Sequence, residues 1–195
     1  DEWSMNDYVR NLPAPLRRLH HIWEGRVLSR AAAATAIHLR MQQALQAAHP
    51  DLGIRFGLVG NGYEEADFTG RTGRLPDRFT LLTAGSHYSR TSPEVLVDAL
   101  GVLLARNPAW RSRMRLRILG FHPPDLDQRV LMRNLSGVVT LEGPRPHSEA
   151  VQAMLDAHAL VLTLTGEANV SSVHPVRLFE YLRAGRPILG FSPEG

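Results

Sequence analysis

The sequence predicts an α/β fold in which a doubly wound parallel sheet follows the tail of a second α/β domain. From residue 79 onward, short apolar runs alternate with helical patterns, as in sheets whose parallel strands are joined by crossover helices. Several of these runs end within a residue or two of a glycine, as strands do where backbone approaches a ligand. Residues 60–78 are rich in glycine and charge and set this region apart from the one before it.

Residues 1–59 carry two helical patterns and two short strand patterns. This set is too small for a complete doubly wound domain. We therefore expect the end of an earlier domain, followed by a linker over residues 60–78. In chain order, the expected elements are a helix over Leu16–Ser29, a strand over Ala31–Ile37, a helix over Leu39–Ala48 and a strand over Ile54–Val59.

Residues 79–191 are expected to form five strands, because short continuous apolar runs are typical of strands buried on both faces. The sequence Ser92-Pro93-Glu94 combines a capping residue, a first-turn proline and an acid, which together favour the start of a helix. The expected strands are Phe79–Ala84, Met114–Leu119, Val138–Leu141, Leu160–Leu164 and Ile188–Phe191. The expected helices are one from Ser92, one over Asp125–Arg133, one over Ser148–Ala157 and one opened by Pro175.

The last expected helix ends at Gly185, the residue type that commonly follows a helix. Its apolar residues Val176, Phe179 and Leu182 are expected to face the core, yet Glu180 stands among them. One interpretation is a solvated ion pair at i,i+3 spacing, which contributes only a few tenths of a kcal/mol. The other is that the carboxylate binds a ligand.

The composition excludes several classes of function. The chain has no cysteine, so it forms neither a disulfide nor a thiolate site, and we expect a cytoplasmic protein. No apolar run approaches the roughly 18–20 residues of a membrane span, and the N-terminus lacks the layout of a signal peptide. The 22 basic residues are all arginine, but they are scattered and the net charge is only +3. We therefore do not expect nucleic-acid binding.

The histidines do not predict a metal site. His20, His21, His122, His147 and His174 lack ligand spacing such as HExxH. The chain also has no P-loop and no nucleophile elbow. We therefore expect neither a metal nor another cofactor.

Several motifs, taken in chain order, resemble the donor-binding half of bacterial GT-B glycosyltransferases of the group 1, family 4-like type. Members of this family often carry a proline–any–lysine–leucine–phenylalanine–glutamate–tyrosine run followed by alanine–glycine–arginine–proline. The resemblance covers roughly residues 55–195. The motifs are NGYEEADF, FTLLTAGSHYSRTSPEVLVDAL, RLRILG, VVTLEGPRPHSE and VHPVRLFEYLRAGRPILGFSPEG.

The resemblance implies a Rossmann-like donor-binding domain over residues 79–195, truncated at its C-terminus, and an acceptor-domain remnant over residues 1–59. It implies hexosyl transfer from a nucleotide-sugar of the UDP, GDP, ADP or dTDP type to a sugar or lipid-linked acceptor, in polysaccharide, glycolipid or glycoconjugate synthesis. The catalytic group is then expected in the missing acceptor domain, which could also associate peripherally with a membrane. We expect this chain alone to recognise a donor with little or no turnover.

The resemblance also assigns roles to particular residues. Glu180 matches the glutamate that binds the donor ribose. Ordinary turns, helix caps or surface charge would explain many of the other residues as well. The expected phosphate-binding residues are Gly85, Ser86, His87, Arg90, Ser171, Ser172 and Arg177, and the expected base pocket is Gly143, Arg145 and Pro146.

One residue departs from the family pattern. Many retaining members have a second glutamate eight positions before the ribose-binding one, where it contacts the transferred sugar, and here that position is Ser172. The sugar and the stereochemical outcome therefore stay open. Two alternatives are a non-catalytic nucleotide-binding or scaffold module of the same fold and a sugar-nucleotide epimerase on a GT-B scaffold.

Overall fold

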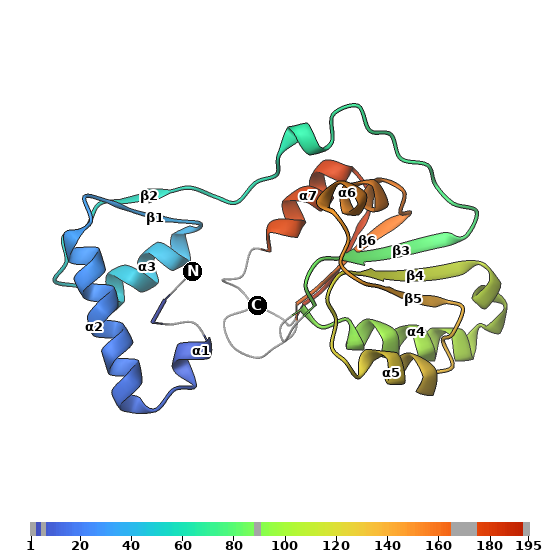
Figure 1. Ribbon diagram of the computed structural model, residues 1–195, viewed down its shortest axis with the longest axis horizontal. Coiled ribbons are helices and arrows are strands. Elements are labelled where there is room, and N and C mark those ends of the chain that lie inside the picture. The colour runs from blue at the N-terminus through green and yellow to red at the C-terminus, as the bar shows by residue number, and fades with distance from the viewer. Residues whose placement is uncertain (1–2, 5–6, 88–90, 165–174, 193–195) are drawn as a thin grey trace. The chain divides into compact units, whose positions relative to one another are not determined.

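A computed structural model describes residues 3–4, 7–87, 91–164 and 175–192 of the chain. The chain divides into two compact units, residues 1–61 and residues 62–195, called here the N-terminal and C-terminal units. Figure 1 labels the α-helices of both units and the strands β1 to β6. Within the described residues, no helix is both long enough and apolar enough to cross a membrane.

The N-terminal unit is a small α/β arrangement. Its two strands pair in parallel, with Ala34 opposite Phe56. Met41 and Leu45 of its third helix are buried with Ala36 in a core of modest size. Its elements are α1 (Asp7–Arg10), α2 (Ala14–Arg30), β1 (Ala34–Ala36), α3 (Leu39–Ala48) and β2 (Phe56–Leu58).

The C-terminal unit is built on five parallel strands in the order β5-β4-β3-β6-β7. The longest ladder joins β3 to β4 from Phe79↔Met114 to Ala84↔Leu119. The strands are β3 (Phe79–Ala84), β4 (Met114–Leu119), β5 (Val139–Glu142), β6 (Ala159–Thr163) and β7 (Ile188–Phe191). The helices are α4 (Glu94–Arg106), α5 (Leu126–Met132), α6 (His147–Leu155) and α7 (Val176–Ala184), with 3₁₀ turns at Glu65–Asp67 and Pro108–Ser112.

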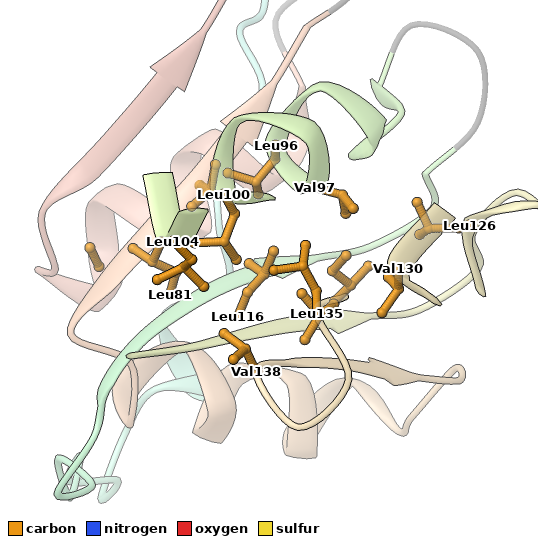
Figure 2. Packing of buried hydrophobic residues seen from close by; sticks show 14 residues of the cluster. Leu81, Leu96, Val97, Leu100, Leu104, Leu116, Leu126, Val130, Leu135 and Val138 are labelled. Carbon is orange, nitrogen blue, oxygen red and sulfur yellow. The ribbon is translucent and has the colours of Figure 1, made fainter. Parts of the chain in front are cut away.

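Helices cover both faces of this sheet. The α4 and α5 helices lie on one face and the α6 and α7 helices on the other (Figure 1). Successive residues of a strand point to opposite faces, so Leu81 packs in the α4 and α5 core while its neighbour Leu82 packs in the α6 and α7 core. Figure 2 shows leucines of α4 directed toward Leu81 and Leu116 of the sheet. The predicted fold class, a doubly wound parallel sheet, is therefore confirmed.

The strand predictions for β3, β4 and β7 agree with the structure residue by residue, and those for β5 and β6 are shifted by one residue. The two strands of the N-terminal unit are shorter than expected. At the start of the first, Ala31 is already extended, but its amide donates to the Leu28 carbonyl at the end of α2, and pairing with the second strand begins only at Ala34. Residues 62–78, expected to be part of a linker, cluster with the C-terminal unit, and Phe68 is buried in its core.

The buried face of α7 differs from the expected one. Val176 and Leu182 are 55% and 61% exposed, whereas Tyr181 and Ala184 are buried. The prediction placed Val176, Phe179 and Leu182 inward; it was wrong for Val176 and Leu182, while Phe179 is partly buried. Tyr181 lies in the core instead, where its hydroxyl has a hydrogen-bond partner. A tyrosine can be buried without cost when its hydroxyl is hydrogen-bonded.

Candidate functional site

The strand order predicts where a ligand crevice lies in this sheet. The chain winds from β3 outward through β4 and β5 in one direction, and through β6 and β7 in the other. In sheets of this topology, ligands bind beyond the carboxyl ends of the strands at the point where the direction reverses. That point lies between the ends of β3 and β6, at Ala84 and Thr163. The Thr163 hydroxyl donates to the Thr91 carbonyl at 2.9 Å and so ties the end of β6 to the segment before α4.

Two glycines allow close backbone contact at the ends of β3 and β4. Gly85 and Gly120 both have positive φ, 118° and 114°. A Cβ on Gly120 would lie 2.1 Å from the Gly85 carbonyl oxygen, and a Cβ on Gly85 would lie 3.1 Å from the guanidinium carbon of Arg177. The Gly85 amide donates to the Leu119 carbonyl at 2.9 Å. Gly85 therefore makes room for Arg177, but its amide is not free to bind a phosphate.

Arg177 is a cation that the fold brings to this crevice. It lies in the first turn of α7, and its Nη2 donates to the Ser86 carbonyl at 2.7 Å. Burial lowers the pKa of Arg177 from its ordinary value, while Tyr181 and Glu180 oppose that shift. Its Nη1 is buried and has no hydrogen-bond partner among the described residues. An unsatisfied buried donor on a cation is costly, so this position favours an anion.

His87 does not fit its expected role as a phosphate ligand. Its side chain is fully buried, and its amide donates to the Phe121 carbonyl at 2.7 Å. Burial, reinforced by the nearby Arg177 cation, lowers the pKa of His87 to about 4, so the imidazole is neutral at pH 7. His87 thus contributes to the packing behind the crevice, and of the loop Gly85–His87 the exposed residue Ser86 is left facing outward.

Glu180 lies beside a histidine that sequence reasoning did not assign to the site. The Glu180 side chain is 17% exposed, and its Oε1 lies 2.7 Å from Nε2 of His147. The other ring nitrogen of His147 lies 3.3 Å from a carboxylate oxygen of Asp67. Arg183, which lies three residues after Glu180 on α7, pairs with Glu65. The available signal for His147 was its position as the first residue of α6, directly after the expected base pocket.

Tyr181 anchors the helix that carries both charged residues. The Ala84 amide donates to the Tyr181 hydroxyl at 2.8 Å, within the core. This bond joins α7 to the last residue of β3. The bond therefore sets the position of Glu180, which directly precedes Tyr181. It also sets the position of Arg177, which lies one turn before Tyr181 on the same side of the helix.

The expected base-pocket residues follow the end of β5. Gly143, Arg145 and Pro146 are all exposed, and a Cβ on Gly143 would meet nothing within 4 Å. Pro146 caps α6 and is followed at once by His147, so this segment leads directly to the Glu180 carboxylate. The phosphate candidates Arg90, Ser171 and Ser172 lie outside the described residues.

The C-terminal unit therefore combines a sheet switch point with a half-buried arginine and a carboxylate. Comparison with solved structures shows the fold to which the chain is similar. The pneumococcal O-GlcNAc transferase GtfA, solved with UDP and GlcNAc, matches 91% of this chain with a TM-score of 0.65 and 17% identity. The chain has the fold of one half of a GT-B glycosyltransferase. WaaG, a glycosyltransferase involved in lipopolysaccharide biosynthesis, matches 95% of it with a TM-score of 0.66 and 17% identity. HepE from Anabaena, solved with UDP and glucose, matches 93% with a TM-score of 0.62 and 16% identity.

This chain covers only part of the length of these GT-B structures. The chain spans 33% of GtfA, 50% of WaaG and 49% of HepE. No family model and no curated protein matches the sequence. The predicted GT-B fold is thus confirmed, while substrate and activity are matters for proposal.

Proposed function

We propose that the chain binds a nucleotide-activated sugar in its C-terminal unit, as the donor-binding part of a glycosyltransferase. The observation that carries this proposal is the presence of Glu180 and Arg177 on one helix beside the switch point of the sheet. A nucleoside diphosphate offers a ribose diol and a chain of negative charge, and these two side chains match the two groups. The likeness to GtfA and HepE, both solved with UDP, supports the same ligand class.

Glu180 would accept hydrogen bonds from the ribose hydroxyls. A carboxylate has two oxygens and can accept several hydrogen bonds at once, so contact with His147 leaves capacity for a diol. His147 holds Oε1 at 2.7 Å and so limits the rotation of the carboxylate before a ligand arrives. Such pre-ordering reduces the side-chain entropy that binding would otherwise cost.

Arg177 would contact the diphosphate. When a glycosyl group leaves, negative charge develops on the departing nucleotide, and a fixed cation stabilises that charge more than it stabilises the bound donor. The guanidinium is held by the Ser86 carbonyl and stands over Gly85. Its buried Nη1, which lacks a partner among the described residues, would donate to a phosphate oxygen.

Calorimetric titration with UDP, GDP, ADP and dTDP tests the proposal. We expect one of the four to bind at a single site. Glu180→Ala should weaken that binding about 10- to 100-fold, because it removes hydrogen bonds to a charged acceptor, each worth about 1.5–3 kcal/mol.

Asp127→Ala is the matched control, since it removes one exposed acid from α5, on the opposite face of the sheet. It should leave nucleotide affinity unchanged. Absence of binding by all four nucleotides would overturn the proposal. An affinity that Glu180→Ala leaves intact would overturn the ribose assignment alone.

A second candidate is a non-catalytic nucleotide-binding module of the same fold. The observation that favours it is Ser172, where many retaining relatives have a glutamate that contacts the transferred sugar. The two candidates differ in how the chain treats the sugar. A donor-binding domain should bind the nucleotide-sugar more tightly than the free nucleotide, or transfer it to an acceptor, whereas a nucleotide module should bind both equally.

A further inference from the structure

The N-terminal unit contains a cluster of side chains that the proposed function does not use. His21 and Glu24 lie three residues apart on α2, and His49 caps the end of α3. One ligand atom from each of the three residues lies within 4.8 Å of the other two. We propose that this cluster binds a divalent transition-metal ion of the zinc type, which links α2 to α3.

Glu24 and His49 lie slightly closer together than two ligands of one metal ion would. Glu24 Oε2 and His49 Nε2 are 2.9 Å apart, and their side chains are 3% and 8% exposed. Two ligands bound at about 2.1 Å lie about 3.0–3.4 Å apart when their bonds make angles between a right angle and the tetrahedral value. A metal ion could therefore replace the proton between these two atoms with little movement of either side chain.

His21 supplies the third donor. Its ring stacks on that of His49, with centroids 4.4 Å apart and planes inclined by 10°. The His21 side chain is exposed, so it can rotate to bring a nitrogen toward the carboxylate at low cost. Two imidazoles and one carboxylate form a ligand set that zinc and related ions use.

The surroundings orient the carboxylate and the deeper imidazole. The Ser4 amide donates to Glu24 Oε1 at 2.9 Å, and the Ser4 hydroxyl donates to Oε2. Hydrogen bonds of this kind position metal ligands. Gly25 makes room for the His49 ring, since a Cβ there would lie 3.2 Å from two of its atoms. Glycine in a helix interior costs about 1 kcal/mol relative to alanine, and close packing of His49 explains its use here.

A groove beside the cluster would let an ion and its remaining water ligands enter. It has a volume of about 360 Å³ and is lined in part by His21, Gly25 and His49. Three protein ligands and one open position facing such a groove are typical of exchangeable zinc sites. The sequence pattern missed the site because His49 lies 25 positions after Glu24, a separation that matches no local metal motif.

Titration of the metal-free chain with Zn²⁺, and with Co²⁺ as a spectroscopic probe, tests this site. We expect one ion per chain, an absorption spectrum of nitrogen and oxygen ligation, and a rise in melting temperature with Zn²⁺. His21→Ala should weaken binding at least about 10-fold and abolish the rise. His21 is exposed and lies outside the contact between Glu24 and His49, so this variant is expected to fold.

His20→Ala is the control for adventitious histidine binding, because His20 neighbours His21 on α2 but its Nδ1 accepts a bond from Trp3. It should bind the ions as the unaltered chain does. The proposal is overturned if no saturable binding occurs. It is also overturned if His21→Ala retains the full affinity, since the ion is then held by a ligand set that does not include His21.

Discussion

At the scale of single residues, the most informative groups in this molecule are buried polar side chains. His87 and Arg177 lie behind and beside the crevice, and each has a buried nitrogen without a hydrogen-bond partner among the described residues. Burial is the main cause of the lowered pKa of both groups. Arginine stays charged in spite of this, because its ordinary pKa lies far above neutral pH, whereas the histidine loses its charge.

The depressed pKa of His87 predicts a pH dependence of stability. Between an ordinary pKa of 6.5 and a folded pKa of about 4, the unfolded chain binds a proton that the folded chain does not, so the free energy of unfolding falls as pH falls through this window. Over this whole pH window, His87 lowers the free energy of unfolding by roughly 3 kcal/mol. Urea denaturation from pH 7 to pH 4 should show this loss in the unaltered chain and a smaller one in His87→Gln.

Comparison with His87→Gln is needed because carboxylates titrate in the same range. Glu142, for example, has a pKa held below its ordinary value by Arg117 and also loses stabilisation as pH falls. That loss is common to both proteins and cancels in the difference. Parallel pH curves for the two proteins would contradict the assignment of a neutral buried His87.

At the scale of elements, α7 is the helix on which the proposed donor site depends. Gly185 ends it in the left-handed conformation, with φ of 66°, as helices commonly end. Its buried face is set by Tyr181 and Ala184. The bond from the Ala84 amide to the Tyr181 hydroxyl connects this helix to the end of β3, and so connects the charged residues of α7 to the switch point.

Tyr181→Phe should therefore destabilise the C-terminal unit. The substitution keeps the ring but leaves the Ala84 amide buried without its acceptor, which costs about 1–3 kcal/mol. The measurement is the urea concentration at the midpoint of unfolding. The comparison requires that the free energy of unfolding has the same slope against urea concentration in each protein. Tyr63→Phe is the matched control, since Tyr63 is 46% exposed and surface changes usually stay within about 0.5 kcal/mol. Equal stability of the two variants would mean that the hydroxyl bond is not a significant tie.

At the scale of the whole molecule, the two units differ in how much apolar surface they bury. The C-terminal unit has a core on each face of its sheet. Among the described residues, the hydrophobic cluster of the N-terminal unit has three buried members, Ala36, Met41 and Leu45. Helix α2 is long, but Glu24 is its fully buried residue, and Trp23 and Val27 are 44% and 57% exposed. Burial of apolar surface is the main source of folding free energy.

We therefore expect the N-terminal unit to open at lower free energy than the sheet of the C-terminal unit. In hydrogen exchange at increasing denaturant, amides of α2 and α3 should lose protection first, and those of β3, β4 and β6 last. Exchange should be slowed in α2 and α3 by Zn²⁺ if the proposed metal site forms. A single common opening energy for both units would contradict this expectation.

The sequence by itself determined the fold class and, to within one residue, the five strands of the C-terminal unit, because strand and helix periodicities are local properties of the chain. The runs at 79–84 and 114–119 and the glycines that follow them predicted the crevice edge, and the family motif around Glu180 predicted a GT-B fold that the solved structures confirm. The donor-site roles themselves stay proposals.

Only the tertiary structure decided which side chains meet across long stretches of sequence. It turned His87 inward, brought His147 to Glu180, buried Tyr181 in place of Leu182, and joined His49 to Glu24. These outcomes depend on which groups find a hydrogen-bond partner when elements distant in sequence pack together. No local pattern encodes that choice, because an unpaired buried polar group is penalised only once the whole fold has excluded water from it.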